Sequence, residues 1–182
     1  AVLTPALSMS FVSAEIVAGN GAVIAVKPGD AVAVCARVAA LGTPRALSIA
    51  AGISASTLQQ AAGPHCAVVR AMPNTPALVR EGVTAITGSD ACTGSDLDWA
   101  ERVLSAVGLV VRVPESQMDA VTAVSGSGPA YVFEFTAALR EAGIAAGLPA
   151  DIAAELAPAF PSLIRVTVGR PSLGETCHYE PA

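Results

Sequence analysis

Short apolar runs alternate with segments of helical pattern over residues 1–114 of the chain. These runs are rich in small and β-branched residues and end at glycine or proline, which predicts buried strands. The predicted strands are 22–26, 45–50, 66–69, 83–87 and 109–113. The predicted helices are 31–40 after a cap at Asp30, a short one from Ser54 or Ser56 to Ala62, and 96–107 after Ser95. Strands that alternate with helices imply an α/β fold with a parallel sheet.

The pattern changes after Glu115, and 116–156 is predicted to contain helices only. The longest of these helices runs from Pro129 to Ala146 and is apolar around most of its circumference. The segment 158–182 shows no helical periodicity, and its one candidate strand is 164–168. At the other end, only a helical turn capped by Ser13 is predicted before residue 20. The chain is thus expected to comprise a sheet-containing domain (1–114), a helical region (115–157) and an atypical tail (158–182).

The composition argues against disordered, nucleic-acid-binding and membrane-spanning proteins. Hydrophobic residues make up 53% and charged residues 14% of the 182 residues, which excludes a disordered chain. The net charge is −5 and the basic side chains are dispersed, which argues against a nucleic-acid partner. No uninterrupted apolar run reaches the roughly 18 residues of a membrane helix, and no basic start precedes an apolar run as in a signal peptide. We therefore expect neither a membrane nor a nucleic acid as a partner.

The cysteines indicate a reducing compartment, and the histidines do not indicate a metal site. The four cysteines are widely spaced and form no C-x-x-C pair, which is typical of buried or incidental thiols in the cytoplasm. The two histidines, His65 and His178, lie far apart and have no ligand spacing around them, so no metal is expected.

Ligands of open α/β sheets bind at the carboxyl ends of the strands. Three predicted strand ends carry residues suited to a ligand, and the first two are open to an ordinary structural explanation as well. The first ends in Lys27-Pro28, and Lys27 is the only lysine of the chain. This lysine either contacts a phosphate or ribose, or is an ordinary solvated side chain. The second strand end is Ile49-Ala-Ala51-Gly52, whose small residues let a planar ligand lie against the backbone. An ordinary strand-to-helix turn would have the same composition.

The third strand end favours a binding function more clearly. It reads Met72-Pro-Asn74-Thr75-Pro, in which two prolines stiffen the loop and two neutral side chains offer hydrogen bonds. Rigid polar loops at strand ends commonly position ligands.

A fourth stretch, Ser125-Gly126-Ser127-Gly128-Pro129, precedes the long apolar helix. Proline suits a first helical turn, whose free N–H groups and dipole attract an anion. The glycines allow close approach to the backbone, and the serine hydroxyls add uncharged donors. The stretch is therefore a candidate cradle for a small carboxylate, with an ordinary capped helix as the alternative.

No side chain presents itself as a nucleophile beside a base, so no catalytic residue is assigned. Neutral donors, small residues and a helix start suit a reaction whose chemistry belongs to a cofactor, such as hydride transfer to an electrophilic carbon.

These motifs together resemble pyrroline-5-carboxylate reductase over about residues 13–156. The resemblance rests on Val26-Lys-Pro28, on Ala50-Ala-Gly52, on Arg70-Ala-Met-Pro-Asn-Thr-Pro76 and above all on Asp119-Ala-Val-Thr-Ala-Val-Ser-Gly-Ser-Gly-Pro-Ala-Tyr131. It implies a Rossmann-type domain, here partial, followed by a helical domain that interlocks two subunits into a homo-oligomer. The implied activity is the reduction of 1-pyrroline-5-carboxylate to L-proline by NADPH or NADH.

Carried over to this sequence, the resemblance assigns two sets of residues. The cofactor would contact Ala25, Lys27, Pro28, Ile49, Ala51, Gly52, Asn74 and Thr75. The substrate carboxylate would lie near Ser125, Gly126, Ser127, Gly128 and Pro129.

The sequence departs from the family at both ends. No G-x-G-x-x-G turn follows a strand, because Gly19-Asn-Gly21 precedes one, and the family's later helices are not recognisable after residue 157. One alternative is therefore an inactive remnant of the family that binds no cofactor. Another is a related dehydrogenase that acts on a hydroxy acid, but the helical part offers no catalytic Lys or His for it.

Overall fold

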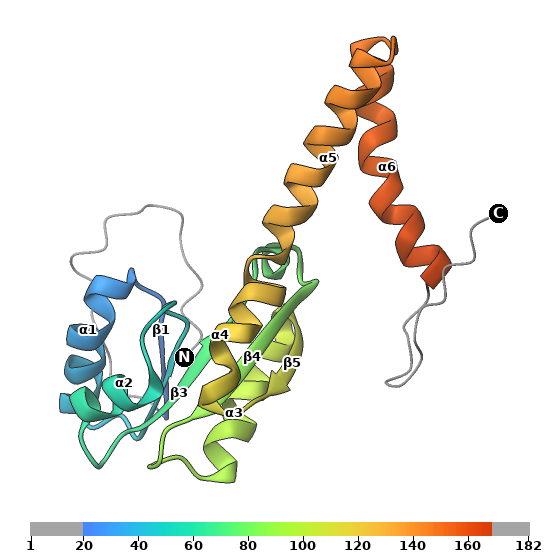
Figure 1. Ribbon diagram of the computed structural model, residues 1–182. Helices are drawn as coiled ribbons and strands as arrows, with labels where there is room; N and C mark the ends of the chain where they lie inside the picture. Colours follow the sequence, from blue (N-terminus) through green and yellow to red (C-terminus); the bar gives the residue numbers. More distant parts are fainter. Residues whose placement is uncertain (1–19, 169–182) are drawn as a thin grey trace. The chain divides into compact units, whose positions relative to one another are not determined.

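The computed structural model describes residues 20–168 (Figure 1). Its first part is built around a sheet of five strands in the order β1-β2-β3-β4-β5. The strands are β1 (Ala22–Ile24), β2 (Arg45–Ser48), β3 (Ala67–Met72), β4 (Gly82–Gly88) and β5 (Gly108–Arg112). The helices between them are α1 (Pro28–Ala40), α2 (Ala55–Ala62) and α3 (Gly94–Leu104). The α/β class is confirmed, and each predicted strand and helix of this part is present with boundaries shifted by a few residues.

The sheet is largely parallel as predicted, but one of its four strand pairings is antiparallel. β1, β2 and β3 pair in parallel and β4 pairs with β5 in parallel, but β4 runs antiparallel to β3. The link between β3 and β4, residues 73–81, holds only the 3₁₀ helix η1 (Thr75–Val79). A parallel connection needs about a dozen residues or more, usually with an α-helix. The short link therefore reverses the chain.

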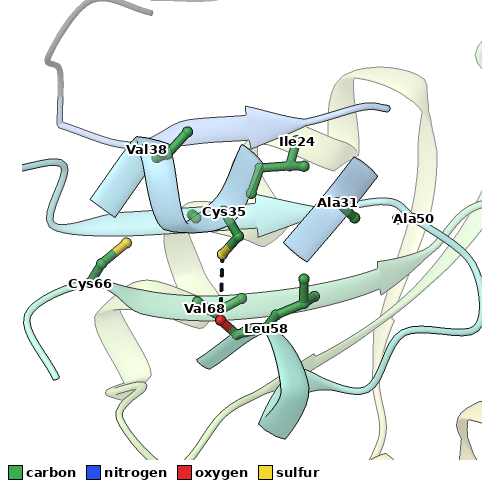
Figure 2. Close-up of a cluster of buried hydrophobic side chains, with 9 residues drawn as sticks. Ile24, Ala31, Cys35, Val38, Ala50, Leu58, Cys66 and Val68 are labelled. Carbon is green, nitrogen blue, oxygen red and sulfur yellow. Dashed lines mark hydrogen bonds between the residues drawn. The ribbon is translucent and has the colours of Figure 1, made fainter. Parts of the chain in front are cut away.

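Helices cover both faces of the sheet. On one face α1 and α2 pack over β1–β3 around Ile24, Cys35, Leu58 and Val68 (Figure 2). On the other face α3 covers Leu47, Val69, Ala71 and Ile86. Because neighbouring strand residues point to opposite faces, Val68 and Val69 belong to different cores.

The three described cysteines are unpaired thiols, as the sequence predicts for a reducing compartment. Cys35 is fully buried, and its Sγ lies 3.5 Å from the carbonyl oxygen of Leu58. Burial, with a smaller contribution from the neighbouring Cys66, raises the pKa of the Cys35 thiol to about 11. This thiol therefore stays protonated at neutral pH. Cys177 and His178 lie outside the described residues, as do the turn predicted at Ser13 and the part of the tail after Val168.

Two helices begin earlier than predicted. α1 starts at Pro28 after Lys27, because proline suits the first turn, and Asp30 lies inside that turn rather than capping it. α3 starts after Thr93, whose N–H and hydroxyl both donate to the Asp96 carboxylate at 2.9 and 2.7 Å. Burial of Asp96 disfavours its charge, but the bonds from Thr93 and the Arg45 guanidinium outweigh this and keep the pKa of Asp96 below its usual value.

The start of β5 requires glycine. Gly108 has φ +145°, and a Cβ atom there would lie 2.0 Å from the carbonyl oxygen of Gly82 on the neighbouring strand. A side chain at residue 108 would therefore push the paired ends of β4 and β5 apart.

Between residues 115 and 168 the described elements are all helical. It comprises η3 (Glu115–Gln117), α4 (Met118–Val121), the π-helix η4 (Thr122–Gly126), α5 (Gly128–Ala145) and α6 (Ala150–Val168). The helical prediction for 116–156 is thus confirmed. The candidate strand at 164–168 was wrong, because α6 continues through it despite two prolines. Those prolines broke the helical pattern in the sequence, since proline disfavours a helix interior.

Contacts between residues divide the chain into two compact units, one ending at Ser127 and the other beginning at Gly128. The first unit holds the sheet together with η3, α4 and η4, and the second holds α5 and α6. The division falls inside the Ser-Gly-Ser-Gly-Pro stretch.

Candidate functional site

The predicted cofactor residues lie at one edge of the sheet. β1, β2 and β3 are parallel, so their carboxyl ends meet there, and the N–H of Ile49 after β2 donates to the carbonyl of Ile24 in β1 at 3.1 Å. All eight predicted residues are exposed or half-buried within loops or at the start of a helix. The exposed ones are Ala25, Lys27, Pro28, Ala51, Gly52 and Thr75, and the half-buried ones are Ile49 and Asn74. The edge is therefore open to a ligand.

Asn74 bridges two distant parts of the first unit. Its Oδ1 accepts a hydrogen bond from the N–H of Val83 at the start of β4 (2.9 Å). Its Nδ2 donates to the carbonyl oxygen of Ser125 (3.2 Å), which lies 51 residues further along the chain. The third strand end and the serine-glycine stretch, predicted independently, are thus in direct contact.

A second contact joins the same two stretches at Gly126. A Cβ atom built on Gly126 would lie 2.8 Å from Cε of Met72, the last residue of β3. It would also lie 3.5 and 3.8 Å from side-chain atoms of Thr122. A side chain at 126 would therefore require the flexible tip of Met72 to move, because the backbone of η4 passes close to it.

The helix predicted from Pro129 to Ala146 is present as α5, and the serine-glycine stretch before it also has a largely helical backbone. α4 and η4 carry a helical backbone up to Gly126, and the N–H of Ser127 donates to the carbonyl of Thr122 at 2.8 Å. The hydroxyl of Ser125 donates to the carbonyl of Val121 at 3.1 Å. The Ser127 N–H therefore has an internal partner, whereas the Ser125 oxygen keeps lone pairs that can accept further hydrogen bonds. A π-turn of this kind inside a helix is common at functional sites.

A partly buried ion pair connects this helical segment to the sheet. Arg70 in β3 is only 5% exposed, and its guanidinium donates to the Glu115 carboxylate in η3. The second oxygen of that carboxylate, Oε2, is buried without a hydrogen-bond partner. Sequence reasoning did not single out this pair. The available signal was an arginine inside the apolar run 67–72, since a buried charge requires a partner.

Among residues 20–168, no three His, Cys, Asp or Glu side chains gather as metal ligands would. Within the same part of the chain, no helix combines the length and apolarity required to cross a bilayer.

Comparison with known proteins points to one family. A family model described as pyrroline-5-carboxylate reductase dimerisation matches residues 115–160. The pyrroline-5-carboxylate reductase of Synechocystis sp. is 48% identical over 135 residues, which is 74% of this chain and 50% of that protein.

Solved structures agree. A pyrroline-5-carboxylate reductase from Coxiella burnetii superposes with a TM-score of 0.74 at 32% identity, over 85% of this chain and 60% of that one. The Plasmodium falciparum enzyme, solved with NADP bound, gives a TM-score of 0.74 at 28% identity, over 84% and 60% of the two chains. The chain thus spans half to three fifths of the length of these relatives. Over that shared length, the chain belongs to the pyrroline-5-carboxylate reductase family.

Proposed function

We propose that the chain acts in the NADPH- or NADH-dependent reduction of 1-pyrroline-5-carboxylate to L-proline. The observation that carries this proposal is the contact between the Met72–Thr75 loop and the Ser125–Ser127 backbone beside the carboxyl ends of three parallel strands. That contact would join the proposed cofactor site to the proposed carboxylate site. The inactive remnant is the less favoured alternative, because Asn74 of the predicted cofactor set bonds to Ser125 of the predicted substrate set.

The sheet edge fits a dinucleotide. Ala51 and Gly52 are exposed, and Gly52 has φ +76° with nothing within 4 Å of the point where a Cβ atom would stand, so a ring or ribose can approach the backbone there. Lys27 is exposed after β1 and supplies a positive charge for a phosphate. The bound cofactor would supply the hydride, while Ala25, Lys27, Pro28, Ile49, Ala51, Gly52, Asn74 and Thr75 would hold and orient it.

The substrate would be held by Ser125–Ser127 and the continuing Gly128-Pro129, all of which are half-buried. These residues carry no charge. The Ser125 hydroxyl and the Ser127 N–H already donate within the segment, so binding of the carboxylate would rest on the Ser127 hydroxyl and on the orientation of the C=N bond toward the nicotinamide. Positioning and electrostatics of this kind are sufficient roles for the protein when the cofactor performs the chemistry.

Titration with NADPH tests the proposal. We expect NADPH at concentrations below millimolar to quench the protein's fluorescence, or to accept energy from it, in a saturable way. We also expect NADPH to be oxidised when 1-pyrroline-5-carboxylate is added. An Ala51→Glu variant should bind NADPH about tenfold more weakly, because its carboxylate would repel the cofactor phosphates. Ala91→Glu is the matched control, since Ala91 is an exposed alanine in the loop after β4. Absence of binding at millimolar NADPH would favour the remnant.

The second unit supports a homodimer. None of the α5 side chains is buried, and large apolar side chains of α5, α6 and their connection are 40–68% exposed. They are Tyr131, Val132, Phe133, Ile144, Leu148, Ile152 and Leu156. Apolar surface of this extent usually marks an interface. A second copy is the proposed partner, because the dimerisation model covers this region.

Light scattering should therefore report a dimer for the full chain. Phe133→Glu should shift the population toward the monomer, because Phe133 is 68% exposed on α5 and would place a charge in the interface. Leu41→Glu is the control, since Leu41 is an exposed leucine at the end of α1 in the first unit. A monodisperse monomer for the unmodified chain would contradict the dimer. We place the protein in the cytoplasm, which suits the unpaired state of Cys35, Cys66 and Cys92.

A further inference from the structure

We infer that Asn74 is a positioning residue for the substrate-binding segment. Its side-chain amide replaces a backbone donor that Pro129 lacks, and it thereby sets the position of the Ser125 carbonyl and of the backbone that follows. This inference rests on the proposed function for the role of the segment. The bridge itself rests on contacts inside the first unit alone.

The need for this donor follows from the sequence. In an α-helix the carbonyl of residue 125 accepts a hydrogen bond from the N–H of residue 129. Residue 129 is proline, which has no N–H. Ser125 lies in the π-helix η4, and the proline removes the α-helical donor that its carbonyl would meet where η4 gives way to α5. A half-buried carbonyl without a partner is costly. Nδ2 of Asn74 supplies the missing donor at 3.2 Å.

The Oδ1 atom of Asn74 also has a hydrogen-bond partner. Asn74 precedes η1 with an extended backbone, where asparagine normally caps the helix with its own side chain, but no such cap bond forms. Instead Oδ1 accepts from the N–H of Val83 at 2.9 Å. Because a backbone N–H faces one end and a carbonyl faces the other, only one orientation of the amide satisfies both partners. The amide therefore fixes Ser125 relative to β4.

Substitution of Asn74 by aspartate should affect binding of the carboxylate ligand more than binding of NADPH. Asn74→Asp keeps an oxygen for the Val83 N–H but places a second oxygen against the Ser125 carbonyl, so repulsion replaces a hydrogen bond. The perturbed group belongs to the carboxylate-binding segment, whereas Lys27, Ala51 and Gly52 at the cofactor edge do not contact Asn74 through any described hydrogen bond. Binding of the carboxylate ligand should therefore suffer more than binding of NADPH.

A double-mutant cycle tests whether the Asn74 amide replaces the backbone N–H that Pro129 lacks. Asn74→Asp should lower the denaturation midpoint of the full chain, and it should lower it less in a Pro129→Ala background, where residue 129 regains its N–H. Asn20→Asp, the same change at the exposed asparagine before β1, should have little effect in either background. Equal destabilisation by Asn74→Asp in both backgrounds would overturn the inference.

Ligand binding tests the positioning role. By calorimetry, Asn74→Asp should weaken L-proline binding in the presence of NADP about tenfold more than it weakens NADPH binding. Equal weakening of both ligands would show that Asn74 acts through the cofactor alone, and no change in either would show that it positions nothing; each overturns the inference. If the unmodified chain binds neither ligand, the proposed function fails, and the cycle alone decides whether Asn74 replaces the donor.

Discussion

Replacement of Gly126 by valine is expected to weaken L-proline binding at least about 100-fold, a loss of about 2.7 kcal/mol in binding free energy. A Cβ atom at this position lies 2.8 Å from Met72 Cε, and the additional methyl groups of valine would also meet Thr122. The π-turn would have to lift away from β3, which would displace Ser125 and break its bond with Asn74. Calorimetry with L-proline, with circular dichroism as a folding check, measures this effect.

A smaller substitution at residue 126 and a control variant test the cause of this effect. Gly126→Ala should be milder, because the contacted atom is the flexible tip of Met72, and Met72→Ala should restore binding further in that background. Gly94→Val is the matched control, since a Cβ atom at Gly94 meets nothing within 4 Å. If Gly126→Val binds L-proline as tightly as the unmodified chain does, the serine-glycine stretch does not form the carboxylate site.

Glu115→Gln is expected to lower the free energy of unfolding by about 2 kcal/mol. It leaves the Arg70 guanidinium, whose side chain is 7% exposed, without a counter-charge. Loss of one partner of a fully buried pair costs about 3–5 kcal/mol. We expect less here because the Glu115 side chain is 38% exposed and its charge is partly screened. Urea denaturation at neutral pH measures the change.

The reciprocal substitution should cost less. Arg70→Met fills the buried space with apolar atoms, and the half-exposed Glu115 carboxylate can turn toward water. Asp98→Asn is the control for a surface ion pair, because Asp98 and its partner Arg112 are 54% and 42% exposed, and it should change stability by less than about 1 kcal/mol. Equal effects of Glu115→Gln and Asp98→Asn would show that the Arg70–Glu115 pair does not anchor the segment.

Local sequence signals determined most of the secondary structure and the chemical character of the site. Apolar runs and their glycine or proline boundaries located all five strands, and Ser54 was one of two predicted starts for α2, where it caps the helix through the N–H of Thr57. The third strand end and the serine-glycine stretch also stood out by composition alone. Such signals work because propensity, capping and turn chemistry depend on residues that are close in the sequence.

The tertiary structure decided what depends on residues that are distant in the sequence. The direction of β4 follows from the length and path of the link after β3, and the contact of η4 with Met72 follows from how the helical segment folds back onto the end of that strand. The bond from Asn74 to Ser125 and the pair of Arg70 with Glu115 span 51 and 45 residues. Neither pairing is encoded in a local pattern, because a hydrogen-bond donor or a buried charge specifies only that it needs a partner, and the fold selects which one.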